Sequence, residues 1–563
     1  MINKIISLIM AVFMSVSGFM TSSVNNIIDT VSVSLFGVPY TDKAVESDFF
    51  SEMDFEDVVE LAKDSGFIKN KIAVFVDSDM SFSDKISFFN ECGGALVGWC
   101  TPADLYVIDC PTMDYEQVVE KCERLSAKSG VELAMPVMTN KTELNLTPAD
   151  DFGATYDEPN VWDELNPNGN NWWLEAINAR QAWDYSDYFS RINIGVLDAG
   201  FDTSHSDLSG KICFPDSIQP IINTPHFHGT HVAGIIGANH NGTGIAGICN
   251  NSNLICADWT PDGLQFWITD IAIYFGFSSL VKAGAKVINL SFGTSGSKAN
   301  NSTDFFERVF NTAATSYMMA SLLSKGYDFI AVQSAGNGDI LGDPINAENN
   351  GHMCALNEDN IFVGSNNVSA QEILDRIIVV SSITNNGDGT YTQSDFSNVG
   401  STVSIAAPGD EIYSTVNIND HDELSGTSMA APMVTGVASL VWSVNPSFTG
   451  AQVKEIVCTS TDKVALINQN VNYFYDDVVL MEYPVVNAKL AVEEAIRRTV
   501  ESVGTVYGNA GEGAEELVYG GKSYTVYSDG SYSFVAPVGS GTAEIYDNSG
   551  NLISTFELTV LAD

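Results

Sequence analysis

A single serine at the head of a long apolar run constrains the fold of this chain most strongly. The run from Met429 to Val444 follows Gly426-Thr427-Ser428 and contains Pro432. Because proline fits a helix only in its first turn, we expect a helix that starts close to Ser428. The free N–H groups and the dipole of a helix N-terminus favour developing negative charge. Ser428 therefore has a position that suits a nucleophile, although a serine also needs a base and an orienting acid.

Two upstream segments offer these partners. His228 opens the small-residue segment His228–Gly234, whose glycines permit close packing of a helix. The segment Arg191–Gly200 is typical of a buried parallel strand that ends in Asp198 and a tight turn. A base and an acid therefore precede the serine in the chain.

With these three segments, the chain resembles the subtilisin-like serine proteases, or subtilases. Asp198, His228 and Ser428 match the three catalytic motifs of that family in the family's own order, Asp, His and then Ser. One residue departs from the pattern, because Ala199 stands where the family usually has Ser or Thr. A hydroxyl group that could support Asp198 is therefore missing.

Further segments carry the same resemblance, which covers roughly residues 173–500. They are Ala176–Asp184, Val287–Gly293, Ser334–Gly338, Ser394–Asn398 and Ala406–Gly409. The resemblance implies that Asn337 donates its side-chain amide to the oxyanion. It also implies that the substrate is bound by Ser291, Phe292, Gly293, Ala335 and Gly336.

The residue types imply a reaction. Ser428 attacks a peptide carbonyl to form a covalent acyl-enzyme, while His228 takes the serine proton and later delivers it to the leaving amine. Asp198 holds the imidazole tautomer and stabilises the imidazolium. No cofactor is needed for catalysis and no metal ligands are assigned. Many subtilases bind structural Ca²⁺, but no contiguous loop here is convincing as a site.

Two other functions remain open at this stage. His226, His228 and His231 form H-x-H-x-x-H, which is similar to the zinc motif of metallo-β-lactamase-like hydrolases, but Thr230 stands where that motif has Asp. On the protease hypothesis, His231 is a packing residue of the helix. The chain could also be a catalytically silent binding protein on a protease scaffold, which the complete set of three residues argues against.

The length of the chain indicates its number of folding units, and its net charge limits the classes of molecule that it can bind. A chain of 563 residues suggests about three folding units. A net charge of −46, from 25 basic and 71 acidic residues, argues against nucleic acid as a partner. Protein or peptide substrates are the expected partners. The nine cysteines are an odd number for an exported protein, and we expect free buried thiols.

The N-terminal segment resembles a targeting signal. Lys4 precedes the apolar stretch Ile5–Met20, which is short for a membrane span and is followed by small residues. We expect a signal peptide over residues 1–23, with an N-terminal membrane anchor as the alternative. No later segment is predicted to cross a bilayer. A secreted, extracellular and bacterial protein is therefore expected.

Residues 24–145 are expected to form a propeptide with a core at about 71–137. The core elements follow the β-α-β-β-α-β order of a ferredoxin-like fold. They are strands at Ile72–Val76, Ala95–Trp99, Leu105–Asp109 and Val131–Val137, with helices at Ser83–Asn90 and Tyr115–Ser129. A further helix is predicted at Phe55–Ser65. The resemblance implies that this region assists folding and inhibits the active site, and a regulatory domain is the alternative.

The remainder is predicted to hold a peptidase domain over 146–500 and a small all-β domain over 501–563. A polar linker, Met138–Asn171, separates the propeptide core from the motifs. The peptidase domain should be an α/β fold with a mostly parallel sheet and helices on both faces. Its strands are predicted at Ile192–Leu197, Leu254–Asp258, Lys286–Leu290, Phe329–Ser334 and Ile377–Ser381. Two long segments, Thr294–Lys325 and Asp339–Arg376, are predicted as surface insertions, either rim elements or passive decoration.

Overall fold

The computed structural model describes most of the chain from residue 48 onward. The described residues are 48–50, 58–62, 65–77, 80–140, 142–144, 171–215, 218–219, 223–242, 244–259, 268–294, 302–338, 343–466, 482–501, 503–511 and 513–560. The predicted signal peptide, 1–23, and most of the predicted linker lie outside the described residues.

A ten-stranded sheet forms the centre of the molecule, with its strands in the order β17-β21-β22-β18-β16-β15-β13-β8-β11-β9. Its middle strands pair in parallel, from β18 across to β11. These strands are β8 (Ile192–Asp198), β11 (Ser252–Asp258), β13 (Val287–Leu290), β15 (Ile330–Ser334), β16 (Ile377–Asn385) and β18 (Ile405–Pro408). The others are β9 (Ile212–Cys213), β17 (Tyr391–Gln393), β21 (Lys463–Leu466) and β22 (Glu482–Val485). Every strand predicted for the peptidase domain is present.

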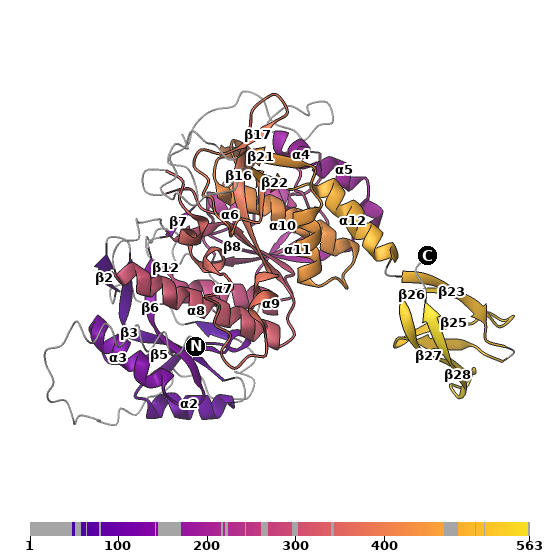
Figure 1. Ribbon diagram of the computed structural model, residues 1–563, viewed down its shortest axis with the longest axis horizontal. Helices are drawn as coiled ribbons and strands as arrows, with labels where there is room; N and C mark the ends of the chain where they lie inside the picture. Colours follow the sequence, from indigo (N-terminus) through magenta and orange to yellow (C-terminus); the bar gives the residue numbers. More distant parts are fainter. Residues whose placement is uncertain are drawn as a thin grey trace.

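Helices cover both faces of this sheet (Figure 1). On one face lie α6 (Phe227–Gly237), α10 (Thr427–Val444), α11 (Gly450–Thr459) and α12 (Ala488–Glu501), and on the other α7 (Asp270–Lys282) and α8 (Ser302–Ser324). Side chains along a strand alternate between the two faces of the sheet. Ile194 and Val196 of β8 belong to the hydrophobic core under α6, α10, α11 and α12, whereas Leu197 belongs to the core under α7 and α8. The prediction of a parallel sheet between two helical layers is confirmed.

The serine helix α10 differs from its prediction in one respect. It begins at Thr427, so Pro432 is its sixth residue and lies inside the helix, and the expectation of a first-turn proline is wrong. Proline lacks the N–H that would reach back to the Ser428 carbonyl. The Ser291 hydroxyl donates to that carbonyl at 2.8 Å instead, which satisfies the acceptor that the proline leaves free.

A second sheet precedes the central one in the chain and has the strand order β10-β1-β4-β5-β3-β6-β12. Its central strands β4 (Ala95–Cys100), β5 (Leu105–Asp109), β3 (Ser65–Val76) and β6 (Val131–Asn140) pair in antiparallel fashion, with helices α2 (Phe82–Glu91) and α3 (Tyr115–Ser126) between them in the chain. The region predicted as a helix, Phe55–Ser65, contains strand β2 (Val58–Ala62) instead. That prediction is wrong because antiparallel pairing with β3 overrides the local helical pattern.

The N-terminal sheet continues into the central domain at both of its edges. On one side, β1 (Asp48–Phe50) pairs with β10 (Ile218–Gln219), and on the other, β6 pairs with β12 (Ile268–Thr269). One face of the sheet packs on α7 and α8, where Phe75 contacts the rings of Tyr274 and Tyr317. The segment Thr294–Lys325, predicted as a surface insertion, contains helix α8, which is buried from Phe310 to Leu322.

Buried charges lie within the same contact. The Asp104 carboxylate accepts from Lys325 Nζ at 2.6 Å and from the Ser321 hydroxyl at 2.8 Å, both on or next to α8. Lys85 Nζ lies 3.8 Å from the same carboxylate, and its side chain is only 6% exposed. Burial lowers the pKa of Lys85. The Asp104 carboxylate therefore joins a lysine of the N-terminal sheet region to one of the central domain.

Strands between residues 503 and 560 form two small antiparallel sheets beyond α12 (Figure 1). One pairs β23 (Val503–Asn509) with β26 (Ser531–Pro537), and the other has the order β25-β24-β27-β28. Its strands are β24 (Glu516–Tyr519), β25 (Lys522–Thr525), β27 (Gly539–Tyr546) and β28 (Leu552–Val560).

In the described part of the chain, one helix has the length and apolar composition of a membrane span. This helix is α10, and almost all of its residues are buried inside the fold. None of the nine cysteines, all of which lie among the described residues, forms a disulfide bond. Cys213 is exposed, and the other eight are buried or half-buried. Burial raises the pKa of Cys249 and Cys354 to about 12, so these thiols stay protonated.

Candidate active site

Asp198 is the last residue of β8 and lies at the carboxyl end of the parallel sheet. Its side chain is fully buried, and one oxygen, Oδ1, accepts from the Ala199 backbone N–H at 2.7 Å and faces His228 Nδ1 at 2.5 Å. The other oxygen, Oδ2, is buried without a hydrogen-bond partner among the described residues. Ala199 has no side-chain hydroxyl that could donate to this carboxylate.

His228 is the second residue of α6, whose N-cap is His226. The His226 ring accepts from the His228 backbone N–H at 3.2 Å, and burial, together with His228, lowers the pKa of His226 to about 4. Because Asp198 accepts at His228 Nδ1, the proton of the neutral ring sits on that nitrogen. His228 Nε2 is then free to act as a base, and it is buried without a hydrogen-bond partner in the described part of the chain.

Ser428 is the second residue of α10, which packs against α6. Its hydroxyl donates to the Ser291 carbonyl at 2.9 Å, while the Ser291 hydroxyl donates to the Ser428 carbonyl. The structure thus brings Asp198 and His228 into direct contact and holds the Ser428 hydroxyl at the carbonyl of Ser291, the residue that follows β13.

The Asn337 side chain is held in one orientation by Thr427. Its Oδ1 accepts from the Thr427 backbone N–H at 2.9 Å and from the Thr427 hydroxyl at 2.8 Å. Its Nδ2 is buried without an acceptor among the described residues. An amide whose acceptor is occupied and whose donor is free suits the binding of an oxygen anion.

Two residues that the sequence analysis did not assign to the site also shape this loop. Thr427 Oγ1 accepts from the Gly336 N–H at 3.1 Å, and Asn398 Nδ2 donates to the Ala335 carbonyl at 2.9 Å. Asn398 Oδ1 accepts from Gly338 N–H at 3.0 Å. Both residues lie in motifs that were noted in the sequence, but only their contacts reveal that they position the loop.

The residues expected to bind the substrate lie along β14 (Phe292–Thr294) and the loop after β15. Strand β14 is already paired, because β7 (Thr142–Leu144) lies antiparallel to it with Leu144 opposite Phe292 and Glu143 opposite Gly293. Phe292 is fully buried, with its ring against Trp259 and His352. A segment that follows the N-terminal sheet therefore occupies the edge of this strand.

Comparison with known proteins identifies the family at this point. Residues 190–476, about half of the chain, match the model of the subtilase family.

The chain belongs to the subtilase family.

Homologues in this family are serine-type endopeptidases. This subtilase is 32% identical over 292 residues to a thermophilic serine proteinase of Bacillus sp. (strain AK1), a match that covers 50% of this chain and 60% of that protein. It is 30% identical over 296 residues to thermitase of Thermoactinomyces vulgaris, covering 52% of this chain and 88% of thermitase. Subtilisin E of Bacillus subtilis (strain 168) is matched over 59% of its length at 29% identity.

The crystal structure of fervidolysin from Fervidobacterium pennivorans, a keratinolytic enzyme related to subtilisin, has a similar fold. Its TM-score is 0.53 at 21% identity, and the similarity covers 89% of this subtilase and 78% of fervidolysin. At this identity the comparison speaks for the fold alone.

The zinc hypothesis does not fit the three histidines of this subtilase. His228 Nδ1 is engaged by Asp198, and His226 Nδ1 by a backbone N–H. His231 Nε2 faces the carbonyls of Ile412 and Asp422 at 2.9 and 3.2 Å. Among the described residues, no group of three or more His, Cys, Asp or Glu side chains could hold a metal ion. His231 instead ties α6 to the hairpin of β19 (Ile412–Val416) and β20 (Asp420–Leu424), as a packing residue.

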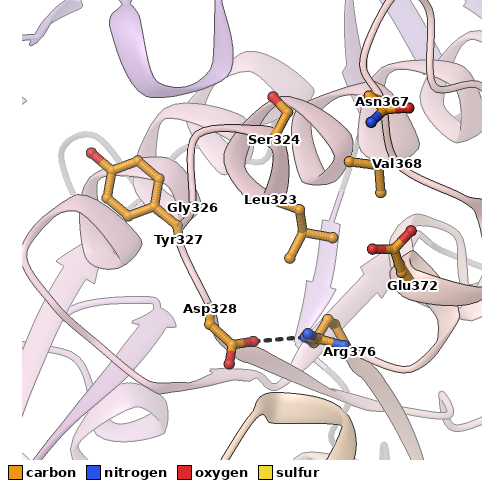
Figure 2. A pocket seen from close by; sticks show the side chains of 9 residues that line it. All are labelled: Leu323, Ser324, Gly326, Tyr327, Asp328, Asn367, Val368, Glu372 and Arg376. Atoms are coloured by element: carbon orange, nitrogen blue, oxygen red, sulfur yellow. Dashed lines mark hydrogen bonds and ion pairs between the residues drawn. The ribbon is translucent and has the colours of Figure 1, made fainter. Parts of the chain in front are cut away.

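A cavity of about 370 Å³ lies away from these residues, between the end of α8 and α9 (Ala370–Leu374). Figure 2 shows its lining side chains, including the ion pair between Asp328 and Arg376 at 2.8 Å. None of the residues expected to act in catalysis or substrate binding lines it. The candidate active site lies elsewhere, at the carboxyl ends of β8 and β15 and the start of α10.

Proposed function

We propose that this subtilase is a secreted serine endopeptidase that is made as a self-processed zymogen. The observation that carries the proposal is the fully buried contact of 2.5 Å between His228 Nδ1 and Asp198 Oδ1, with Ser428 near the start of the adjacent helix. A buried carboxylate fixes the imidazole tautomer and stabilises the imidazolium that forms when the base takes a proton. Protein or peptide substrates follow from this chemistry.

The reaction begins when the Ser428 hydroxyl leaves the Ser291 carbonyl and turns to His228 Nε2. The serine oxygen then attacks the substrate carbonyl as Nε2 takes its proton. The oxyanion is bound by Asn337 Nδ2 and the Ser428 backbone N–H, which belongs to a helix N-terminus. Collapse of the intermediate releases the amine with the proton from His228, and water then hydrolyses the acyl-enzyme. This sequence uses no cofactor.

Active-site variants test the proposal. Ser428→Ala and His228→Ala should each reduce peptide hydrolysis to near background, and Asp198→Asn should cost about 10⁴-fold in kcat because it favours the wrong tautomer. Ser439→Ala is the matched control, since Ser439 lies on the same helix and its hydroxyl bonds to the Thr435 carbonyl. A fluorophosphonate probe should label the wild-type protein and not the Ser428→Ala variant. Normal turnover by a folded Ser428→Ala protein would refute the assignment.

The zymogen proposal rests on the position of β7. This strand pairs with β14 as an extended substrate would, and it follows directly on the N-terminal sheet that packs against α7 and α8. The N-terminal region thus occupies the substrate strand before processing, and it can template a slow-folding parallel sheet. We propose self-cleavage in the segment from Met138 to Trp162, followed by degradation of the released propeptide.

N-terminal sequencing of the secreted protein tests this proposal. The wild-type protein should begin between residues 138 and 162, while the Ser428→Ala protein should retain residues 71–137. Adding active wild-type enzyme to the variant should restore the cut. Trimming of the purified Ser428→Ala protein at the same bond, without added protease, would rule out self-processing.

Secretion is the third part of the proposal. It is supported by the signal-like N-terminal sequence and by the similarity to bacterial subtilisins. Expression of the full chain in a bacterial host should deliver protein to the medium without residues 1–23. Retention of the uncut chain in the membrane fraction would favour the N-terminal anchor instead.

A further inference from the structure

The side chain of Asn350 lies against two glycines of the proposed substrate site. Asn350 is the last residue of the 3₁₀ helix Ala347–Asn350, within the segment Asp339–Arg376 that the sequence analysis predicted as an insertion, and it is 3% exposed. A Cβ atom at Gly293 would overlap with Asn350 Oδ1, and one at Gly336 would lie 2.8 Å from the same oxygen. Asn350 therefore occupies the space next to both glycines.

The hydrogen bonds of Asn350 leave one group of its amide free. Nδ2 donates to the Ser334 carbonyl at 2.7 Å, which fixes the orientation of the side chain. Oδ1 has no hydrogen-bond donor among the described residues, although a carbonyl oxygen can accept two. An acceptor without a donor therefore points at the two glycines.

The register of β7 on β14 relates this acceptor to a bound substrate. In this register, Leu144 lies opposite Phe292 and Glu143 opposite Gly293. The next residue of a substrate chain bound in the same register would lie opposite Ser291, whose carbonyl accepts the hydrogen bond of the Ser428 hydroxyl. That residue is the one whose carbonyl the serine attacks, and we call it the acyl-side residue. Residues two apart on a strand share a face, and directly paired residues also share one. The acyl-side side chain therefore lies on the face where Gly293 meets Asn350.

We propose that Asn350 determines the acyl-side preference of this subtilase, selecting a short side chain with a hydrogen-bond donor, such as Asn or Ser, over a large aromatic one. The proposal rests on the endopeptidase function proposed above. The volume of Asn350 limits the length of the side chain, and its free Oδ1 accepts the donor. Without that donor, a buried acceptor remains unpaired in the complex, which costs binding in the transition state.

Peptides that differ only in the acyl-side residue test the proposal. With wild-type enzyme, kcat/KM should be roughly tenfold or more higher for Asn or Ser than for Phe. Asn350→Ala should shift the Phe-to-Asn ratio of kcat/KM by at least about tenfold toward Phe, because it removes the obstruction and the acceptor together. Asn350→Leu keeps most of the volume without the acceptor, so it should lose the preference for Asn and still reject Phe.

The ratio of two substrates in one preparation does not depend on the fraction of active enzyme, so partial misfolding of a variant does not hide the result. Asn360→Ala is the matched control, because Asn360 lies in the same segment and bonds to the Ala355 carbonyl. Its ratios should equal those of the wild type. A wild-type enzyme that prefers Phe to Asn, or an Asn350→Ala ratio unchanged from wild type, would overturn this inference alone. Failure of the wild-type protein to cleave any peptide or to react with fluorophosphonate would overturn the proposed function as well.

Discussion

His231 should make the fold of this subtilase sensitive to acid. Its ring is fully buried, and Nε2 donates to the carbonyls of Ile412 and Asp422, so the neutral ring carries its proton there. Nδ1 is buried without a donor among the described residues. Burial, assisted by His228, lowers the pKa of His231 to about 3. In the unfolded chain, a histidine takes up its proton near pH 6.5.

The sign and size of the effect follow from this difference. Below about pH 6.5 the unfolded state binds a proton that the folded state does not, so stability is complete above that pH and is lost as the pH falls toward 3. Each pH unit in this window costs about 1.4 kcal/mol of the free energy of unfolding. Between pH 6.5 and pH 4.5, His231 alone should therefore lower that free energy by roughly 2 kcal/mol, because half of the unfolded chains are already protonated at pH 6.5.

The assay is urea unfolding of the full chain in a Ser428→Ala background, which prevents self-digestion, at pH 7.5, 6.5, 5.5 and 4.5. His231→Gln keeps an N–H donor and does not titrate, so its stability should fall less steeply with acid, by about 1.4 kcal/mol for each unit below 6.5. Carboxylates contribute equally to both proteins and cancel in this comparison. Ser439→Ala, which removes a buried hydroxyl but no titrating group, should shift the stability without changing its slope against pH. Identical slopes for the His231→Gln protein and its parent would refute the reasoning.

Three further predictions concern the oxyanion loop and the contact with the N-terminal sheet. Asn337→Ala should lower kcat by about 10²–10³-fold with little change in KM, and a pure KM effect would instead make Asn337 a binding residue. Thr427→Val keeps the shape of the side chain but removes one donor to Asn337 Oδ1 and the acceptor for the Gly336 N–H. It should lower kcat by roughly tenfold. An unchanged kcat would show that the backbone N–H of Thr427 is enough to orient Asn337. Asp104→Asn should destabilise the unprocessed Ser428→Ala protein by about 3 kcal/mol in urea unfolding, because it leaves the buried Lys85 without its carboxylate, and adding Lys85→Met should recover part of the loss. Additive effects of these last two changes would contradict a direct interaction.

The amino-acid sequence by itself identifies the elements that depend on local pattern. Parallel strands such as Ile192–Asp198 are largely apolar, and the helix after Ser428 consists mostly of apolar or small residues, so their types could be predicted from composition and spacing. The candidate acid, base and nucleophile were predicted because each lies in a short motif at the end of such an element, and because the three motifs resemble those of the subtilases in the same order. The local sequence pattern gave a wrong prediction at Val58–Ala62. It favoured a helix there, but these residues form a strand that pairs with β3.

Only the tertiary structure decided which side chains and strands meet. The reciprocal bonds of Ser291 and Ser428, the pairing of β7 with β14, and the position of Asn350 beside Gly293 all join residues far apart in the chain. Periodicity reports which face of an element is apolar, but it carries no information on the partner of that face or on the register of two strands. Those depend on how whole elements pack, because side-chain volume and buried hydrogen bonds must be satisfied together across the fold.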